Sequence, residues 1–547
     1  MEKKNNPTLQ QLLQQSVKQY ADRNALSFVD GKPIPYKEFQ AAVDNVQDML
    51  TLLGIGTGDK VAILSHNMPN WGIVYFAVTT LGAVVVPLLP DFSLVEIENI
   101  LNHSESKALF VSRRLKSKIE NIKVDALDVK IELDNFFVFD SKKEEIKYVN
   151  TEYVVKPEDL AAIVYTSGTT GKSKGVMLTH GALLAQLDMV DIIQKVNKDD
   201  IFLSILPLPH MYECSLGFLT PINNGASIYY LEKPPTVSIL LPALKKIRPT
   251  YMCSVPMIIE KIYRSSILPK IEKSAVTRTM YKIPFTRKIV HRSAAKKLYE
   301  AFGGRLKFFG IGGAKLDSSV ERFLYEGKVF PYAIGYGLTE TAPLIAAATP
   351  EIVKHQSTGF SLPGVELKID NPIKGEGEIW ARGANIMKGY YKEKALTEEV
   401  LTHDGWFKTG DLGAFDHEGR LYIKGRLKNV ILGASGENIY PEEIESVINN
   451  FKYVNDSLVL EEKGKLVAMV RFNYDELEKQ YRQFKEEFKQ NWELKRQELE
   501  EKIEQLKQEL KDYVNSRVNR FSQISVVVAL QNDFEKTSTQ KIKRYLY

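Results

Sequence analysis

The stretch from Ile163 to His180 reads IVYTSGTTGKSKGVMLTH and carries the residue types of a phosphate-binding loop. Glycines let backbone N–H groups approach an anion closely, while Ser and Thr hydroxyls add donors and lysines add positive charge. The stretch contains the GK[ST] end of a Walker A motif, but Thr166 stands where that motif requires glycine. The pattern therefore excludes a P-loop and leaves either another kind of phosphate site or a plain turn.

The longer string YTSGTTGKSKGVMLTH resembles the phosphate loop of the adenylate-forming enzymes, which include acyl-CoA synthetases, luciferases and nonribosomal-peptide adenylation domains. Further motifs that resemble those of this family follow in order along the chain: LPLPHMYE, GIGGAKL, GYGLTET, DGWFKTGDLG, KGRLKN and EKTSTQKIKR. The resemblance implies that ATP phosphates contact the loop residues Thr166, Ser167, Gly168, Thr169, Thr170, Gly171, Lys172 and Lys174.

The other motifs imply roles for single residues. The resemblance assigns adenine, ribose or phosphate contacts to Gly312, Gly313, Tyr336, Gly337, Asp411 and Arg426. It assigns catalytic roles to His210 beside the acyl pocket, Thr339 on the α-phosphate, Glu340 as the Mg²⁺ ligand and Lys541 near the C-terminus, and it places Lys428 at an interdomain hinge. Taken alone, His210 also fits a core histidine and Lys541 a solvated tail residue.

The resemblance implies a reaction in two halves. A carboxylate attacks the α-phosphorus of ATP, which gives an acyl-adenylate and pyrophosphate, and a thiol then displaces AMP. Both partners of the first step are anionic, so positioning and charge neutralisation must supply most of the catalysis, and no side-chain nucleophile is needed. The implied cofactors and co-substrates are ATP, Mg²⁺ and coenzyme A. In this family the small C-terminal domain rotates between the two steps.

Three features favour a long-chain fatty acid as the substrate. The tail TSTQKIKR, the string GRLKNVILGASGENIYPEEIE and a helical insertion at about 475–520 resemble the long-chain acyl-CoA synthetases. The chain departs from the family pattern at Gln540, where many members have glycine, and at Leu432, where some have lysine. Two alternatives stay open: transfer of the acyl group to a carrier-protein thiol, and an inactive, lipid-binding member of the family.

The elements that must position these residues follow an α/β pattern. Short β-branched runs such as KVAILSH, AAIVYTS and RLKFFGIGG alternate with helical segments, and several end in Gly, Ser or His. We expect a large N-terminal adenylation domain over residues 1–426, with parallel α/β sheets and a small β region. A mobile α+β lid is expected over residues 427–547. Its insertion at 475–520 should form an antiparallel helix pair with a narrow apolar stripe.

Composition limits the partners. The chain has 547 residues, two cysteines and a net charge of +5, which suits a cytoplasmic protein in a reducing compartment and does not indicate a nucleic-acid partner. Its longest apolar runs are too short to span a membrane. Residues 261–307 are basic and partly aromatic, so we consider peripheral docking on the inner face of the membrane through Arg287, Lys288 and Arg292. The alternative is an ordinary solvated helical face.

Overall fold

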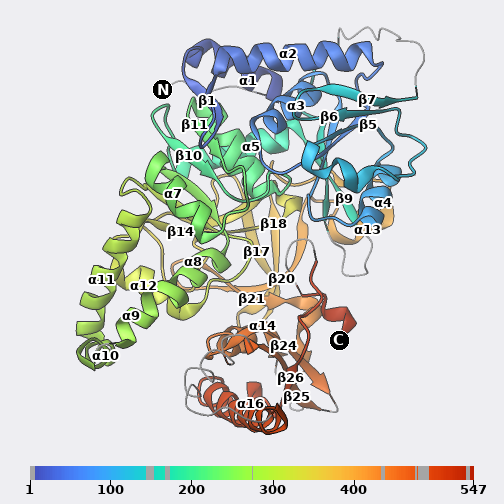
Figure 1. Cartoon of the computed structure of the whole chain (residues 1–547). Coiled ribbons are helices and arrows are strands. Elements are labelled where there is room, and N and C mark those ends of the chain that lie inside the picture. The colour runs from blue at the N-terminus through green and yellow to red at the C-terminus, as the bar shows by residue number, and fades with distance from the viewer. Residues whose placement is uncertain are drawn as a thin grey trace.

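The computed structural model describes residues 7–142, 153–166, 173–273, 275–432, 438–462, 464–474, 477, 492–537 and 542–547 (Figure 1). Two large sheets and their helices fill the upper part of Figure 1, and a smaller C-terminal unit lies below them. No helix in these ranges is both long enough and apolar enough to cross a bilayer.

The first sheet carries the strand that precedes the expected phosphate loop. Its centre, from β8 to β6, is parallel, and β9, β19 and β7 pair antiparallel at the edges. Apolar runs such as KVAIL form its interior strands, as expected for parallel strands that are covered on both faces. The strand order is β19 (Gly389–Tyr390), β9 (Lys174–Thr179), β8 (Leu160–Thr166), β4 (Val84–Leu88), β3 (Lys60–Leu64), β5 (Ser106–Val111), β6 (Val129–Glu132) and β7 (Phe137–Ser141).

The second sheet delivers the adenine-side motifs. Its strands from β1 to β14 run parallel, while β2, β15 and β16 are antiparallel to their neighbours. The order is β16 (Phe360–Ser361), β15 (Leu344–Ala348), β14 (Tyr332–Gly337), β13 (Phe308–Ile311), β12 (Tyr251–Ser254), β10 (Ile201–Ser204), β11 (Ser227–Tyr230), β1 (Asn24–Phe28) and β2 (Ile34–Pro35). The GIGG and GYGLTET motifs therefore emerge at the carboxyl ends of neighbouring parallel strands, where open α/β sheets bind ligands.

Helices pack on both sheets. Helix α3 begins with proline, which suits a first helical position, and its residues are buried all round in a core cluster that includes Val61 of one sheet and Ile228 of the other. The helices of this part are α1 (Leu9–Tyr20), α2 (Tyr36–Leu52), α3 (Pro69–Thr80), α4 (Leu94–Ser104), α5 (His180–Ile193), α6 (Thr220–Asn224), α7 (Val237–Ile247), α8 (Pro256–Ile262), α9 (Leu268–Lys273), α10 (Ala275–Lys282), α11 (Pro284–Ala301), α12 (Ser318–Gly327) and α13 (Lys394–Val400). Short helical turns are η1 (Arg113–Ile119), η4 (Thr339–Thr341) and the π-helical η2 (Glu213–Leu219) and η3 (Tyr263–Ile267).

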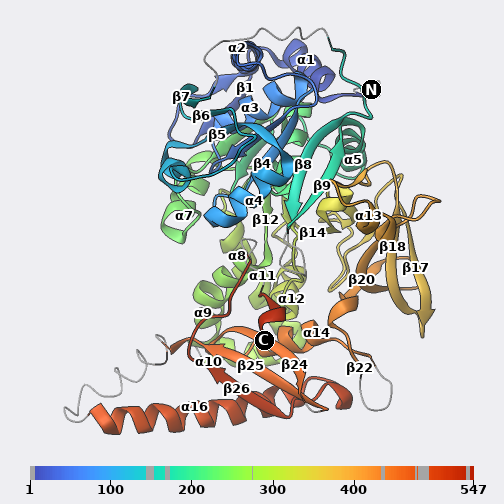
Figure 2. The same ribbon diagram turned by 90° about the vertical axis from the view of Figure 1, so that its right-hand side faces the viewer.

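A small antiparallel sheet follows the two large sheets and is seen best in Figure 2. Its order is β17 (Glu366–Ile373), β18 (Glu376–Arg382), β20 (Phe407–Phe415) and β21 (Leu421–Arg426). Asp411 on β20 lies opposite Arg426 on β21 in the strand register. The separate β region expected around EGEIWARGANIMKGYY is thus present in β18, although Gly389 and Tyr390 join the first large sheet as β19.

The C-terminal unit has its own hydrophobic cluster, which includes Ile444, Val470 and Leu510. It comprises η5 (Leu427–Asn429), β22 (Ile431–Leu432), β23 (Asn438–Ile439), α14 (Pro441–Ile448), β24 (Val454–Glu462), β25 (Lys465–Phe472), α16 (Trp492–Asn515), η6 (Arg520–Ser522), β26 (Val526–Leu530) and η7 (Arg544–Leu546). Strands β24, β25 and β26 form one three-stranded sheet, and α16 lies against β26.

The structure confirms the α/β class with a large N-terminal part and a smaller C-terminal unit. Of the expected helix pair, α16 is present, and Leu506 and Leu510 of its apolar stripe are fully buried. The first helix of the pair falls at 475–491, where only residue 477 is described. The segment 433–437, which contains Gly436 and Glu437, also lies outside the described residues.

Candidate functional site

The expected phosphate loop connects an antiparallel hairpin. Thr166 ends β8, Lys174 begins β9, and the two residues are register partners. A Walker A loop instead leads from a strand into a helix, so this geometry agrees with the exclusion made from Thr166. Lys174 Nζ lies 5.2 Å from the centre of the Tyr390 ring, within cation–π range. The expected loop residues Ser167, Gly168, Thr169, Thr170, Gly171 and Lys172 lie outside the described residues.

Glu340 lies in the turn η4 together with Thr339. The Tyr390 hydroxyl donates to Glu340 Oε1 at 2.9 Å, and the Met387 backbone N–H donates to the Glu340 carbonyl oxygen at 2.8 Å. Burial, followed by the nearby Glu340 charge, raises the pKa of Tyr390, so the phenol remains a donor at neutral pH. Tyr390 thereby connects the expected metal ligand with the lysine that closes the phosphate loop.

The Glu340 carboxylate fits a magnesium ion on chemical grounds. Within the described residues there is no group of three or more His, Cys, Asp or Glu side chains that could enclose a metal. Mg²⁺ does not need such a group, because it commonly binds through one or two carboxylates together with substrate phosphates and water. Tyr390 engages one Glu340 oxygen and orients the carboxylate, as outer partners of metal ligands usually do.

Tyr336, Asp411 and Arg426 form one connected polar group. The Tyr336 hydroxyl donates to Asp411 Oδ2 at 2.7 Å, and Arg426 Nε lies 2.8 Å from Asp411 Oδ1. The Asp411 backbone N–H donates to Thr409 Oγ1 at 3.0 Å. Desolvation, followed by the Asp411 charge, raises the pKa of Tyr336. The structure therefore brings together three residues that the motifs placed on adenine and ribose, from β14, β20 and β21.

Two glycines of the motifs are required by local geometry. Gly313 follows β13 with φ +82°, a left-handed conformation that favours glycine. A Cβ on Gly337 would lie 1.8 Å from the Pro343 carbonyl oxygen, so no side chain fits there. Gly312 packs close to Tyr212, whose ring atoms would lie 3.5 Å from an added Cβ. Gly313 and Gly337 therefore occupy backbone positions near the ends of β13 and β14 that a side chain would strain or block.

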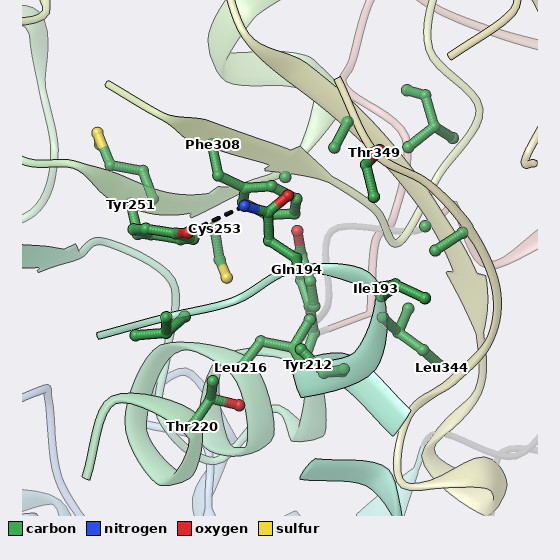
Figure 3. Close-up of a pocket in the computed structure, with 18 of the residues that line it drawn as sticks. Ile193, Gln194, Tyr212, Leu216, Thr220, Tyr251, Cys253, Phe308, Leu344 and Thr349 are labelled. Carbon is green, nitrogen blue, oxygen red and sulfur yellow. Dashed lines mark hydrogen bonds between the residues drawn. The ribbon is translucent and has the colours of Figure 1, made fainter. Parts of the chain in front are cut away.

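An apolar pocket is lined in part by β14, the strand that also carries Tyr336 (Figure 3). Its walls come from α5, η2, α6 and the strands β10, β12, β13, β14 and β15, and the polar groups in its lining are few. The lining residues are Val190, Ile193, Gln194, Val196, Phe202, Tyr212, Leu216, Thr220, Tyr251, Met252, Cys253, Phe308, Gly310, Ala333, Ile334, Gly335, Leu344, Ala347, Ala348 and Thr349. Because Gly335 precedes Tyr336 on β14, a pocket residue and the residue expected to contact adenine occupy neighbouring positions of one strand.

One part of the pocket wall is aromatic and hydrogen-bonded. The Tyr251 ring stacks on Phe202 and Phe308, with ring centres 5.0 and 5.7 Å away. Gln194 Nε2 donates to the Tyr251 hydroxyl at 3.0 Å, which in turn donates to the Lys195 carbonyl oxygen at 2.8 Å. Figure 3 shows the hydrogen bond between Gln194 and Tyr251 in the pocket wall. These contacts fix the end of α5 against β12.

The π-helical turn η2 follows His210 and supplies another wall. Tyr212 and Leu216 of this stretch line the pocket, and His210 lies two residues before Tyr212. Behind the wall, burial raises the pKa of Glu213 to about 8, so its carboxyl group is largely neutral at pH 7. An uncharged group there is compatible with an apolar acyl pocket.

The two remaining expected residues belong to the C-terminal unit. Lys428 lies in the exposed turn η5, directly after β21. Lys541 lies outside the described residues, between Lys536, which pairs with Asp456 at 2.8 Å, and the bridge partner Ile542. Polar contacts join this unit to the rest of the chain: Tyr440 donates to Glu376 at 2.6 Å, and Lys315 lies 3.9 Å from Glu443.

Sequence reasoning missed Tyr390 and the residues around Tyr251. Tyr390 follows Glu340 by 50 positions and lies in a stretch interpreted only as a β region. Its signal would have been a tyrosine beside a glycine in GYY, which is too common to single out. The pocket residues run from Val190 to Thr349 and share only apolar character. No short motif identifies such a set.

Known proteins are similar to this chain over most of its length. The family model described as AMP-binding enzyme matches residues 13–391. A peroxisomal long chain acyl-CoA synthetase 7 of Arabidopsis thaliana is 29% identical over 446 residues, 74% of this chain and 63% of the relative, so the match spans less than two thirds of that relative. A fatty acyl-CoA synthetase A of Dictyostelium discoideum is 30% identical over 76% of this chain and 68% of the relative.

Solved structures show the same fold. O-succinylbenzoate coenzyme A synthetase of Bacillus subtilis, in complex with AMP, superposes with a TM-score of 0.75 at 24% identity, over 98% of this chain and 97% of that one. ATP-bound MatB from Rhodopseudomonas palustris gives a TM-score of 0.74 at 22% identity, over 99% and 98%. At these identities the likeness establishes the fold.

Proposed function

Because the chain belongs to the family of AMP-binding enzymes, as its motifs predicted, we propose that it is a long-chain fatty acid–CoA ligase that forms AMP. The substrate carboxylate attacks the α-phosphorus of ATP and pyrophosphate leaves. The CoA thiol then attacks the acyl carbonyl and AMP leaves. The observation that carries the proposal is that the apolar pocket is lined by Gly335, the residue before Tyr336, which supports binding of an apolar acid next to the expected nucleotide site.

Each of the expected residues has a separate role in the first step, the formation of the acyl-adenylate. Tyr336 offers its ring to adenine, and Asp411, held by Arg426, accepts hydrogen bonds from the ribose. The loop from Thr166 to Lys174 and the Thr339 hydroxyl donate to phosphate oxygens. Glu340 would hold Mg²⁺, which neutralises phosphate charge when bound. His210 would stand near the carboxylate of the acid, and Lys541 would stabilise charge on the reacting phosphate.

We also propose that the domain boundary lies at residue 426. Residues 427–547 then form a lid that rotates about Lys428 between the two steps, so that Lys541 serves only the first. Three observations support this division: β21 ends at Arg426, Lys428 is exposed in a short turn, and the C-terminal unit has its own core. Polar contacts between the units, such as that of Tyr440 with Glu376, suit an interface that opens and closes.

The proposed partners are a fatty acid and CoA, in the cytoplasm, with peripheral contact to the inner face of a membrane. Long-chain acids are favoured because the similar Arabidopsis protein is described as a long chain acyl-CoA synthetase and because the pocket lining is apolar. A reducing compartment suits Cys214 and Cys253, which are both free and buried. The surface that would meet the membrane is identified in the next subsection.

Product analysis by mass spectrometry tests the function. The protein is incubated with ATP, Mg²⁺ and an equimolar series of short to long fatty acids, with and without CoA. We expect long-chain acyl-CoA and AMP to form only when CoA is present. Acyl-adenylate that accumulates equally in both samples would overturn CoA as the acceptor and indicate a carrier-protein thiol. Absence of product from every acid would contradict the ligase assignment.

A further inference from the structure

We propose that the corner formed by α10 and α11 inserts its apolar tip into an anionic lipid bilayer. This inference rests on the peripheral membrane contact included in the proposed function and assigns it to particular residues. Helices α9, α10 and α11 form the lower left corner of the molecule in Figure 1, and α10 marks its extremity. We call the exposed residues of α10, α11 and the connecting Ile283 the basic corner.

Apolar side chains are unusually exposed at the turn between the two helices. Ile283, Phe285 and Ile289 have exposed fractions of 52, 76 and 52%. Phe285 and Ile289 are four residues apart on α11 and therefore lie on the same face, directly after Ile283. Single exposed apolar residues are common on protein surfaces, but three neighbouring ones at a projecting turn form a local patch that indicates an interaction site.

Cations surround this tip. Arg278 and Lys282 are exposed on α10, and the α11 face that starts with Phe285 and Ile289 continues through Lys288, Arg292 and Lys296. For Arg278, Lys282, Lys288, Arg292 and Lys296 the structure records no ion pair with any described residue. Apolar side chains flanked by cations match the headgroup region and the acyl region of one membrane leaflet. Lysine and arginine bind the anionic headgroups, while the apolar tip enters the acyl region.

Arg287 is not part of this surface, which corrects its inclusion in the docking hypothesis made from the sequence. Its guanidinium binds Glu326 of α12 through Nε at 2.9 Å and Nη2 at 2.7 Å. Only 20% of the Arg287 side chain and 10% of the Glu326 side chain are exposed. Arg287 therefore fastens α11 to α12, and reversing its charge would disturb the fold. Lys296 replaces it in the docking set.

Other occupants fit the basic corner less well. A symmetric contact with the same corner of a second copy of the chain would bring cations against cations. A nucleic acid would meet the cations and could stack a base on Phe285, but it would leave the exposed isoleucines Ile283 and Ile289 without an apolar partner. A bilayer satisfies both the charge and the apolar tip. It also contains dissolved fatty acid, the substrate class proposed for the pocket.

Vesicle flotation with the full chain tests the assignment. The unmodified protein is mixed with vesicles of phosphatidylcholine alone or of phosphatidylcholine with phosphatidylglycerol. We expect binding only to the anionic vesicles, weakened by added salt. The variant Lys288→Gln, Arg292→Gln, Lys296→Gln should bind roughly 100-fold more weakly, at about fivefold for each lost cation. Three exposed lysines elsewhere serve as the matched control: Lys18, Lys123 and Lys233, each changed to Gln, should leave binding unchanged.

Insertion of the tip is tested separately with Phe285→Trp. Tryptophan fluorescence of this variant should be quenched by bromine-labelled acyl chains in anionic vesicles more strongly than that of the unmodified protein. Ligase activity on a short, water-soluble acid is measured in parallel, so that loss of function and loss of docking are told apart. Equal vesicle binding by both triple variants, absence of binding by the unmodified protein, or absence of additional quenching in Phe285→Trp would overturn the proposal.

Discussion

The proposed nucleotide site and the proposed acyl pocket include neighbouring residues of β14, Tyr336 and Gly335, but they are built in different ways. On the nucleotide side, named polar atoms face each other at short distances: Tyr336 and Arg426 lie 2.7 and 2.8 Å from Asp411, and Tyr390 lies 2.9 Å from Glu340. In the acyl pocket the contacts are mostly apolar, and the hydrogen bond between Gln194 and Tyr251 is an exception.

This difference reflects the two ligands. Phosphates, ribose and a metal ion require particular donors, acceptors and charges in the protein. If a substitution leaves a buried polar group of the ligand or the protein unpaired, binding loses the full desolvation free energy of that group. An acyl chain requires only space and apolar surface. Each methylene group that is buried stabilises the bound acid by about 0.8 kcal/mol. Substitutions on the nucleotide side should therefore change the rate with every acid, whereas substitutions in the pocket should change which acid is used.

The largest effect is expected for Glu340→Gln. Loss of the carboxylate charge removes the proposed Mg²⁺ ligand, and removal of one group that stabilises transition-state charge typically lowers kcat by roughly 10²–10³-fold. Acid-dependent pyrophosphate exchange should fall by that factor for short and long acids alike, while thiolysis of supplied acyl-AMP is largely retained.

The matched control for this prediction is Glu398→Gln. Glu398 is exposed on α13 and lies 3.8 Å from Lys394, so its loss should leave both half-reactions unchanged. A decrease in exchange for Glu340→Gln that affected only long acids would break the contrast between the two regions, because it would place Glu340 in substrate selection.

The same contrast explains what could be predicted from the sequence. Tyr336, Asp411 and Arg426 stand in short motifs, and the structure brings all three together. Tyr390 was missed because hydrogen-bond partners distant in sequence leave no local pattern. The individual pocket residues were not identified because residues from Val190 to Thr349 contribute to the pocket from eight elements, and apolar residues there look like any other core residues.

Gly335→Val should act on acid selection. A Cβ at Gly335 would lie 2.9 Å from Leu344 Cδ2, so the new side chain occupies the pocket and pushes Leu344 further into it. Displacing about three methylenes of an acyl chain should lower kcat/KM for the longest accepted acid by roughly 50-fold. The measurement is kcat/KM across a series of chain lengths. Activity with short acids should remain.

A second pocket variant guards against local distortion of β14. Ala347 on β15 is the register partner of Gly335 and also lines the pocket, so Ala347→Val should shift the preferred chain length in the same direction. The KM for ATP is the internal control in both variants, because Tyr336 is the neighbour of Gly335. An equal loss with every acid would show that the pocket and the nucleotide site are not separable on this strand.

The fold also has features that the sequence predicted and features that it did not. Regular alternation in the sequence predicted the α/β sheets, and the apolar stripe of α16 was confirmed at Leu506 and Leu510. The exposure of charged side chains was harder to predict from the sequence, because the orientation of a helix about its own axis decides which of them face inward. Arg287 appears equivalent to Lys288 in the sequence, yet it pairs with Glu326 in the structure. Only the packing of α11 on α12 separates the two roles.

The smallest of the three effects is expected for Tyr390→Phe. The phenol positions Glu340, and loss of an outer partner of a metal ligand costs at least about tenfold in metal affinity. The Mg²⁺ concentration needed for half-maximal pyrophosphate exchange should rise roughly tenfold, while the rate at saturating Mg²⁺ recovers. The adjacent Tyr391 contacts Glu105 at 3.5 Å, so Tyr391→Phe is a matched control without this effect. A lowered rate that excess Mg²⁺ did not restore would contradict the positioning role, because it would mean that Tyr390 acts on the phosphate loop through Lys174 rather than on the metal ligand.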